Sequence, residues 1–87
     1  MINNLPTLDL HGEYRDSARI LINEFIDDYY KLGYEKVVII HGIGKGILKD
    51  EVKKNLKNNK KVSKFYIDFM NVGSTIVELS KKYWQKE

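Results

Sequence analysis

The chain has 87 residues, a length that fits one domain with a modest core and leaves no room for a second. Its composition, 43% hydrophobic and 31% charged, is typical of a globular protein, and the absence of cysteine excludes disulfides and thiolate metal sites. The net charge is only +3, and no apolar run reaches the roughly 18–20 residues of a membrane-spanning helix. We therefore expect no association with a membrane.

We expect a single domain over residues 1–87, with a core at 8–79, a short N-terminal arm at 1–6 and a C-terminal tail at 80–87. The first ten residues lack both the basic region and the long apolar region of a signal peptide. A cytoplasmic location is therefore predicted, and the lack of cysteine is compatible with that reducing compartment.

The first predicted elements are a strand and a helix. Residues 7–11 alternate apolar and polar side chains, which predicts a strand whose two leucines face one side and whose Asp9 and His11 face the other. Apolar residues then recur every three or four positions and predict a helix over residues 14–32 that ends before Gly33. The apolar stripe of this helix consists of Ala18, Leu21, Ile22, Phe25, Tyr29 and Leu32.

The next strand and helix flank a glycine-rich loop. Residues 36–40 form an apolar, β-branched run, which is typical of a central strand covered on both faces. The sequence HGIGKG follows at residues 41–46, and we call it the glycine loop. A second helix is predicted from about residue 47 to residue 58. Its buried edge consists of Leu48, Val52 and Leu56.

Two further strands are predicted at residues 62–70 and 74–79, joined by a tight hairpin turn at residues 71–73. The last strand is a candidate for an exposed edge. The order β-α-β-α-β-β predicts right-handed crossovers between parallel strands and an antiparallel final hairpin. The fold class is therefore α/β, a two-layer sandwich of a four-stranded mixed sheet and two helices. The side chains of the third strand that share one face are Phe65, Ile67 and Phe69.

A His-Gly pair follows each of the first two predicted strands, in LDLHG at residues 8–12 and in the glycine loop. Ligands of open α/β folds bind where the carboxyl ends of parallel strands meet, so both histidines are expected at that edge of the sheet. Histidines beside a carboxylate suit proton transfer at a phosphodiester. The candidate catalytic residues are therefore Asp9, His11 and His41.

The glycine loop has the features of a phosphate site. Its glycines allow positive φ angles, and it leads into a helix N-terminus, where free N–H groups and the helix dipole attract anions. Lysines add positive charge, although the loop lacks the spacing of a Walker motif. The candidate phosphate-binding residues are Gly42, Gly44, Lys45, Gly46 and Lys49.

Each of these features also has a purely structural interpretation. The glycines fit an ordinary tight turn, each histidine fits a role in the fold, and Asp9 fits an acceptor for backbone N–H groups at the strand end. Two histidines and a carboxylate can also bind a metal, but no local HxxxH spacing supports this, and no metal ligands are predicted. The alternative cofactor is Mg²⁺, bridged by phosphate and held by Asp9.

Positive charge is concentrated in residues 45–64, which hold eight lysines against Asp50 and Glu51. This segment carries a net charge of +6, and the rest of the chain carries −3. Such asymmetry is expected of a protein that binds nucleic acid, although a solvated helix face gives the same pattern. The candidate nucleic-acid-binding residues are Lys53, Lys54 and Lys57.

The order of these motifs resembles one family. LDLHG, an alanine six residues after its glycine, then VVIIHGIGKGILKDEV and TIVEL together resemble the small MutS-related (Smr) domain, from about Leu8 to Leu79. The resemblance implies a fold similar to the C-terminal domain of translation initiation factor three. It also implies nucleic-acid binding, often with endonuclease activity, as DNA nicking in some members and RNA cleavage in others. It places the catalytic positions at Asp9, His11 and His41, and we expect a stand-alone member.

Three positions depart from the family pattern. Many members that are fused to MutS-like proteins have arginine in place of His11. Tyr14 stands where a capping Thr or Ser is common, and the loop over residues 71–74 is shorter than the glycine-rich loop of many members.

The sequence supports functions of different classes. The first is an endonuclease that cleaves DNA or RNA. The alternative is a non-catalytic nucleic-acid or ribosome-associated binding module that uses the lysine-rich second helix. A third is recognition of a small-molecule phosphate, with Tyr66 and Trp84 as candidate base-stacking residues. We expect a monomer or a weak homo-oligomer.

Overall fold

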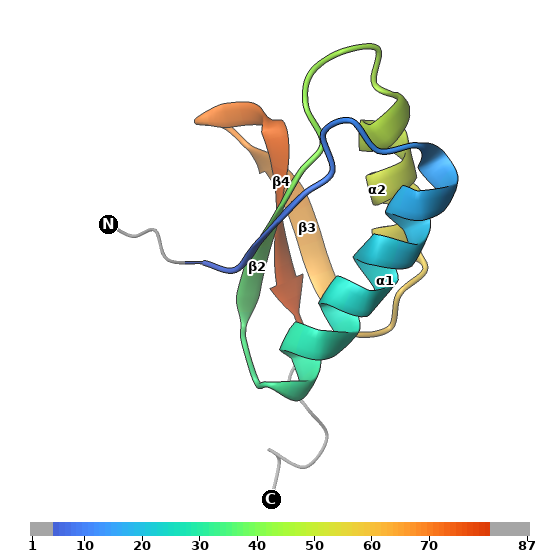
Figure 1. Ribbon diagram of the computed structural model, residues 1–87. Helices are drawn as coiled ribbons and strands as arrows, with labels where there is room; N and C mark the ends of the chain where they lie inside the picture. Colours follow the sequence, from blue (N-terminus) through green and yellow to red (C-terminus); the bar gives the residue numbers. More distant parts are fainter. Residues whose placement is uncertain (1–4, 81–87) are drawn as a thin grey trace, which may run out of the picture.

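The computed structural model describes residues 5–80 and has two layers, a sheet and a pair of helices (Figure 1). Both helices lie on the same face of a four-stranded mixed sheet, which confirms the predicted fold class. The predicted C-terminal tail, apart from Ser80, and Trp84 lie outside the described residues. The elements in chain order are β1 (Thr7–Asp9), α1 (Arg15–Lys31), β2 (Lys36–Ile40), α2 (Ile47–Lys57), β3 (Val62–Asp68) and β4 (Asn71–Leu79).

The strand order in the sheet is β1-β2-β4-β3. β1 and β2 are parallel neighbours, and β4 is antiparallel to both β2 and β3, as the order of elements predicted. The expectation that the last strand forms an exposed edge is wrong, because β4 returns from the hairpin into the space between β2 and β3. The edge strands are β1 and β3, so β4 and β2 form the centre of the sheet.

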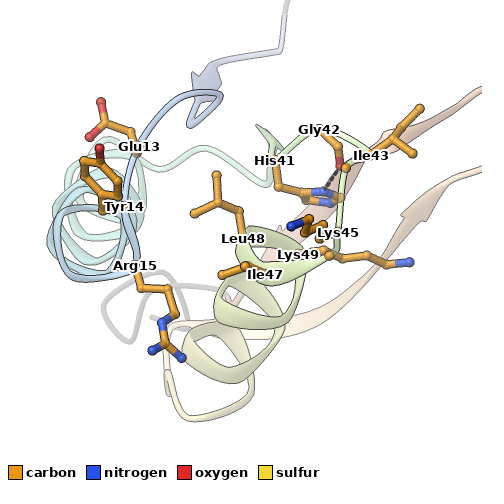
Figure 2. A pocket seen from close by; sticks show the side chains of 12 residues that line it. Glu13, Tyr14, Arg15, His41, Gly42, Ile43, Lys45, Ile47, Leu48 and Lys49 are labelled. Carbon is orange, nitrogen blue, oxygen red and sulfur yellow. Dashed lines mark hydrogen bonds between the residues drawn. The ribbon is translucent and has the colours of Figure 1, made fainter.

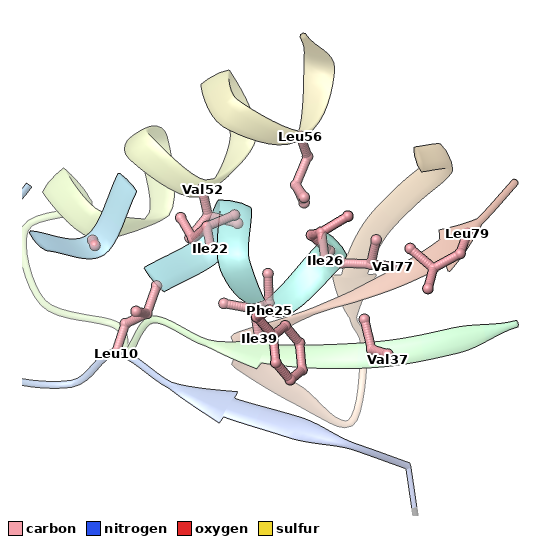
Figure 3. Packing of buried hydrophobic residues seen from close by; sticks show 11 residues of the cluster. Leu10, Ile22, Phe25, Ile26, Val37, Ile39, Val52, Leu56, Val77 and Leu79 are labelled. Atoms are coloured by element: carbon pink, nitrogen blue, oxygen red, sulfur yellow. The ribbon is translucent and has the colours of Figure 1, made fainter. Parts of the chain in front are cut away.

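The core lies between the helices and one face of the sheet (Figure 3). Burial along β2 alternates, with Val37 and Ile39 fully buried and Val38 half-buried between them. The prediction that this strand is covered on both faces is therefore wrong, because both helices pack on the same side. The buried hydrophobic residues are Leu10, Ala18, Ile22, Phe25, Ile26, Val37, Ile39, Val52, Leu56, Val77 and Leu79.

The ends of the first strand and helix differ slightly from the prediction. β1 ends at Asp9 because the N–H of Glu13 donates to the carbonyl of Leu10 and closes a turn. Leu32 is 68% exposed, since α1 ends one residue earlier and the chain turns away at Gly33, which has a φ of +86°. The apolar stripe of α1 therefore ends without Leu32, and Ile26 joins it instead.

The final hairpin turns earlier than predicted. The turn is at Phe69 and Met70, whereas Asn71 already begins β4. The carboxylate of Asp68 accepts a hydrogen bond from the N–H of Met70 at 2.9 Å and fixes this turn. A register shift between Ile67 and Asp68 and the turn itself remove Phe69 from the face of Phe65 and leave it 88% exposed.

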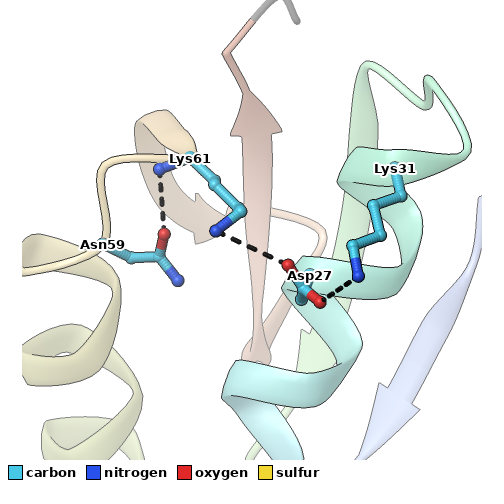
Figure 4. A network of polar contacts seen from close by, with 4 residues as sticks. All are labelled: Asp27, Lys31, Asn59 and Lys61. Atoms are coloured by element: carbon cyan, nitrogen blue, oxygen red, sulfur yellow. Dashed lines mark hydrogen bonds and ion pairs between the residues drawn. The ribbon is translucent and has the colours of Figure 1, made fainter.

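A small ionic network joins α1 to the segment after α2, at the end of the molecule opposite the glycine loop (Figure 4). The carboxylate of Asp27 lies 3.1 Å from the Nζ of Lys31 and 3.5 Å from the Nζ of Lys61. The side-chain amide oxygen of Asn59 accepts a bond from the Lys61 N–H. The hydrogen bond from Lys31, with a smaller contribution from Lys61, lowers the pKa of Asp27.

Candidate functional site

The two His-Gly pairs leave the sheet side by side. In the parallel pairing of β1 and β2, Asp9 lies opposite Ile40, and the N–H of Leu10 donates to the Ile40 carbonyl at 2.8 Å. Figure 1 shows that both helices also begin at this end of the sheet. The LDLHG segment, the glycine loop and two helix N-termini therefore lie at one edge, where anions are attracted.

His41 is buried, with only 5% of its surface exposed. Its Nδ1 lies 2.9 Å from the carbonyl oxygen of Gly42 (Figure 2), and its Nε2 lies 2.9 Å from the hydroxyl oxygen of Thr75. A carbonyl only accepts, so in the neutral ring Nδ1 donates to Gly42 and Nε2 accepts from Thr75. His41 thereby fastens the start of the glycine loop to β4.

His11 has the opposite environment. It is exposed, and it occupies the turn that the Glu13 N–H closes onto the Leu10 carbonyl. Within residues 5–80, no hydrogen bond involves its imidazole ring. Its backbone N–H donates to the carboxylate of Asp9 at 3.0 Å, so Asp9 acts as an acceptor at the strand end. The other carboxylate oxygen of Asp9 accepts no hydrogen bond from the described part of the chain.

The glycine loop is held on both sides. The N–H groups of His41 and Gly42 both donate to the carbonyl of Gly73 in β4 at 2.9 Å. Gly46 caps α2 with a φ of +84°, and the first bond of that helix runs from the Asp50 N–H to the Gly46 carbonyl at 2.9 Å. The N–H groups of residues 47–49 precede this bond and therefore face the open N-terminal end of the helix.

A surface pocket of about 490 Å³ covers this helix N-terminus. Residues 13–15, at the start of α1, form one wall, and the loop and first turn of α2 form the other (Figure 2). Its cations are Arg15, Lys45 and Lys49, with Glu13 as the acidic group. We call it the phosphate pocket. Asp9 and His11 do not line it, but His11 lies only two residues before Glu13.

The sequence prediction missed Glu13, Tyr14 and Arg15. A signal for them existed in the order of elements, since two helices that follow parallel strands begin at the same end of the sheet. Residues at the start of the first helix then face the start of the second. Lys45 and Lys49 do lie in the pocket with His41, as the motif suggested. Their roles stay predictions.

The remaining predicted lysines lie further along α2. Lys53, Lys54 and Lys57 are exposed and line a separate shallow depression with Asp50 and Asn58. Among residues 5–80, no group of three or more His, Asp or Glu side chains is placed to hold a metal ion. Neither of the two described helices is long and apolar enough to cross a membrane.

Comparison with known proteins identifies the family. The Smr domain model matches residues 8–80. The chain belongs to the Smr domain family. It is 39% identical over 80 residues to "Endonuclease MutS2" of Caldanaerobacter subterraneus subsp. tengcongensis, and 40% identical over 74 residues to "Endonuclease MutS2" of Helicobacter pylori. These matches cover 88% and 85% of this chain but only 10% of each relative, so the Smr chain spans about a tenth of their length.

Two solved structures share the Smr fold. The Smr domain of Thermus thermophilus MutS2 has a TM-score of 0.84 at 24% identity, covering 87% of this chain and 99% of that one. YdaL, a stand-alone small MutS-related protein from Escherichia coli, has a TM-score of 0.85 at 23% identity, covering 91% and 67%. The resemblance carried by LDLHG and HGIGKG is therefore confirmed at the level of family and fold.

Proposed function

We propose that this Smr domain binds nucleic acid and cleaves a phosphodiester bond where the LDLHG segment meets the glycine loop. The observation that carries the proposal is the exposed imidazole of His11, which makes no hydrogen bond in the described fold and lies at the same edge of the sheet as the cation-lined N-terminus of α2. Relatives with the name "Endonuclease MutS2" support the same reaction class.

The phosphate pocket supplies the grip on the backbone. A phosphate at the N-terminus of α2 accepts hydrogen bonds from the N–H groups of residues 47–49 and lies at the positive end of the helix dipole. Lys45 and Lys49 add charge from the same segment, and Arg15 adds charge from the facing helix. These donors are in place before the substrate arrives, so they stabilise the extra negative charge of a pentacoordinate phosphorane without reorganisation.

The exposed histidine is the proton-transfer group. The nucleophile is a water molecule or a ribose 2′-hydroxyl, which forms a new bond to phosphorus as the bond to the leaving oxygen breaks. A neutral His11 accepts the proton from the nucleophile and returns it to the leaving oxygen. The second carboxylate oxygen of Asp9, two residues before His11, is the group that we propose to orient the ring or a water. The alternative is a Mg²⁺ ion held by Asp9, which EDTA would remove.

His41 is a positioning residue in this proposal. Its two ring nitrogens are occupied by Gly42 and Thr75, so it acts by fixing the loop that carries the phosphate-binding N–H groups. Removing it should therefore weaken phosphate binding as well as cleavage, whereas removing His11 should affect cleavage alone.

The same hydrogen bonds favour a second candidate, a nucleic-acid or ribosome-associated module without turnover. With His41 occupied and one Asp9 oxygen bonded to the backbone, proton transfer rests on His11 alone. The exposed lysines of α2 would then carry binding through phosphate contacts. Replacement of Lys53, Lys54 and Lys57 together by alanine should weaken binding and lower its salt dependence if this face carries the affinity.

The two candidates are separated by running binding and cleavage on the same proteins. Labelled single-stranded RNA and supercoiled plasmid are incubated with the wild type, His11→Ala and the double variant Lys45→Ala/Lys49→Ala, in Mg²⁺ and in EDTA. The proposal expects wild-type cleavage of at least one substrate, loss of cleavage with retained binding in His11→Ala, and weaker binding in the double variant.

Binding without cleavage of either substrate, in every lane, would overturn the nuclease and leave the binding module. Cleavage that persists in His11→Ala would remove this residue from the reaction. Cleavage in Mg²⁺ that EDTA abolishes would assign a metal to the site and make Asp9 its first candidate ligand.

A further inference from the structure

The tip of the β3–β4 hairpin exposes large apolar side chains. Phe69 is 88% exposed, Met70 is 80% exposed and Val72 is 54% exposed. We call residues 69–72 the hairpin tip. None of its side chains belongs to the core or packs against it. Burial of a phenylalanine contributes strongly to stability, so a ring left almost wholly in water at a fixed turn indicates a role outside the fold.

The hairpin tip is fixed against the glycine loop. The carbonyl of Gly73, the next residue, accepts the N–H groups of His41 and Gly42. A Cβ atom at Gly73 would lie only 3.3 Å from the backbone of Gly42, a tighter contact than most Cβ atoms make, so a side chain here would crowd the glycine loop. The side chains of Asp68 and Asn71 accept backbone N–H groups within the turn and strand. The hairpin is therefore fastened to the glycine loop, and its tip lies at the same end of the sheet as that loop (Figure 1).

Lysines of α2 and apolar side chains of β3 line a second depression. A groove of about 250 Å³ is lined by Lys49 and Lys53 of α2 and by Phe65 and Ile67 of β3. It shares Lys49 with the phosphate pocket, so the two depressions adjoin. The glycine loop also exposes an apolar side chain, that of Ile43, which is 69% exposed. Basic residues that track a backbone, with apolar rings beside them, are the composition of single-strand binding grooves.

We propose that the hairpin tip stacks on an unpaired base of the strand whose phosphate occupies the phosphate pocket. This rests on the proposed function and names its substrate class as single-stranded or looped nucleic acid. An unpaired base offers a free face to Phe69, whereas a base in a duplex must first be unstacked at a cost in free energy. Stacking is tolerant of sequence, so no strong base preference is expected.

The test compares affinities for a single strand and a duplex. Fluorescence anisotropy with a labelled oligo-dT strand, the same strand with abasic sites, and a blunt duplex is measured for the wild type and for Phe69→Ala. We expect Phe69→Ala to weaken single-strand binding by about 5- to 150-fold and duplex binding by less than about twofold. Abasic sites should weaken wild-type binding by a similar factor and should add little to the variant.

Two controls separate stacking from general damage. Phe69→Trp keeps an aromatic face and should retain single-strand affinity. Leu32→Ala removes another exposed apolar side chain, which is 68% exposed at the C-terminal end of α1. This variant should bind the single strand and the duplex as the wild type does. Since Phe69 lies outside the core, both Phe69 variants should melt at the wild-type temperature.

Equal losses on the single strand and the duplex, or no loss on either, would overturn the stacking proposal. If Lys45→Ala/Lys49→Ala still weakens binding in that case, the proposed function stands and only the substrate class fails. If the wild type binds neither these probes nor the single-stranded RNA, the proposed function fails first. A wild-type dimer that Phe69→Ala converts to a monomer, with nucleic-acid affinity unchanged, would assign the tip to self-association and contradict base stacking.

Discussion

The two His-Gly pairs of this Smr domain are alike in sequence and different in environment. Gly12 and Gly42 both adopt a positive φ, +88° and +83°. Yet His11 is exposed, and its ring makes no hydrogen bond to residues 5–80, whereas His41 is 5% exposed with both ring nitrogens bonded. The difference arises from the position of the two strands. β1 is at the edge of the sheet and ends in solvent, whereas β2 is central and ends against β4.

The His-Gly motif therefore determines where each histidine lies in the fold, but not which role it has there. Parallel strands bring both pairs to one edge whatever each histidine does there. The neighbouring strand decides the role, because Thr75 of β4 supplies the partner that occupies His41, and β1 has no such neighbour on its outer side within the described sheet. This contrast supports the proposed division of labour, in which His11 transfers protons and His41 holds the loop.

The largest expected effect is on the cleavage rate, which should depend on His11. His11→Ala should lower the cleavage rate by about 10²- to 10⁴-fold, the usual contribution of a general acid or base. Because the ring is exposed and makes no bond in the described fold, the free energy of unfolding should stay within about 0.5 kcal/mol of the wild type, which is roughly 2–4 °C in melting temperature. Initial cleavage rates and thermal melts of the same preparations provide the measurement. A destabilised variant, or one of wild-type activity, would remove the contrast between the pairs.

The next largest effect is on the stability of the fold, which should depend on His41. His41→Ala leaves the Thr75 hydroxyl and the Gly42 carbonyl without their partner in a buried site, which should lower the free energy of unfolding by about 2–3 kcal/mol. For a domain of this size, the melting temperature should fall by roughly 10–20 °C. Thermal or urea unfolding measures the change.

Thr75 offers a matched control for that loss. Thr75→Ser keeps the hydroxyl and should retain most of the stability, whereas Thr75→Val replaces it by a methyl group and leaves His41 Nε2 unpaired, at a cost of about 1–2 kcal/mol. Equal melting temperatures for the two variants would show that the bond to His41 does not hold the loop.

A smaller effect tests the backbone of the glycine loop. Gly46→Ala forces a Cβ into a φ of +84° and should cost about 1–2 kcal/mol or shift the loop. Gly44 has no positive φ and open space around it, so Gly44→Ala should be nearly neutral in stability. Unfolding free energies and affinity for the single-stranded probe are compared for the pair. Similar losses at both positions would show that the loop conformation does not depend on Gly46.

The smallest effect concerns the ionic network far from both histidines. The lowered pKa of Asp27 means that its ion pairs stabilise the fold above the usual pKa of 3.8, and that this contribution is lost as the pH falls through the lowered value. Asp27→Asn should lower the melting temperature slightly at neutral pH and not at all well below pH 3.8. Melting curves at both pH values and at high salt check this, since salt screens exposed pairs. A difference that grows in acid would contradict it.

Much of this fold could be predicted from the sequence because its signals are local. Period-two and period-3.6 patterns placed β2 correctly and α1 and α2 within one residue of their ends. The hairpin turn was misplaced because asparagine and glycine at 71–73 resemble turn residues. In the structure, the Asn71 side chain accepts a hydrogen bond from the Gly73 N–H, and Gly73 lies so close to Gly42 that a side chain would crowd it. Both are tertiary requirements that have no local signature.

The candidate site also combines features that the sequence predicts with features that depend on tertiary structure. The convergence of the two His-Gly pairs follows from strand direction and was predictable. The burial of His41 was not, because it depends on β4 entering the sheet beside β2, which the order of elements leaves open. The contribution of Tyr14 and Arg15 to the pocket depends similarly on how the two helices face each other.

The most direct test of the central claim is a nuclear magnetic resonance titration of ¹⁵N-labelled protein with a short single-stranded oligonucleotide. We predict that the largest changes in amide chemical shift occur at residues 42–49 and 12–15, where both His-Gly turns and both helix N-termini lie. Residues 33–36 and 57–61, at the opposite end of the molecule, should remain unchanged. Shifts confined to the C-terminal half of α2 or to that opposite end would contradict the claim that the double His-Gly edge is the nucleic-acid site.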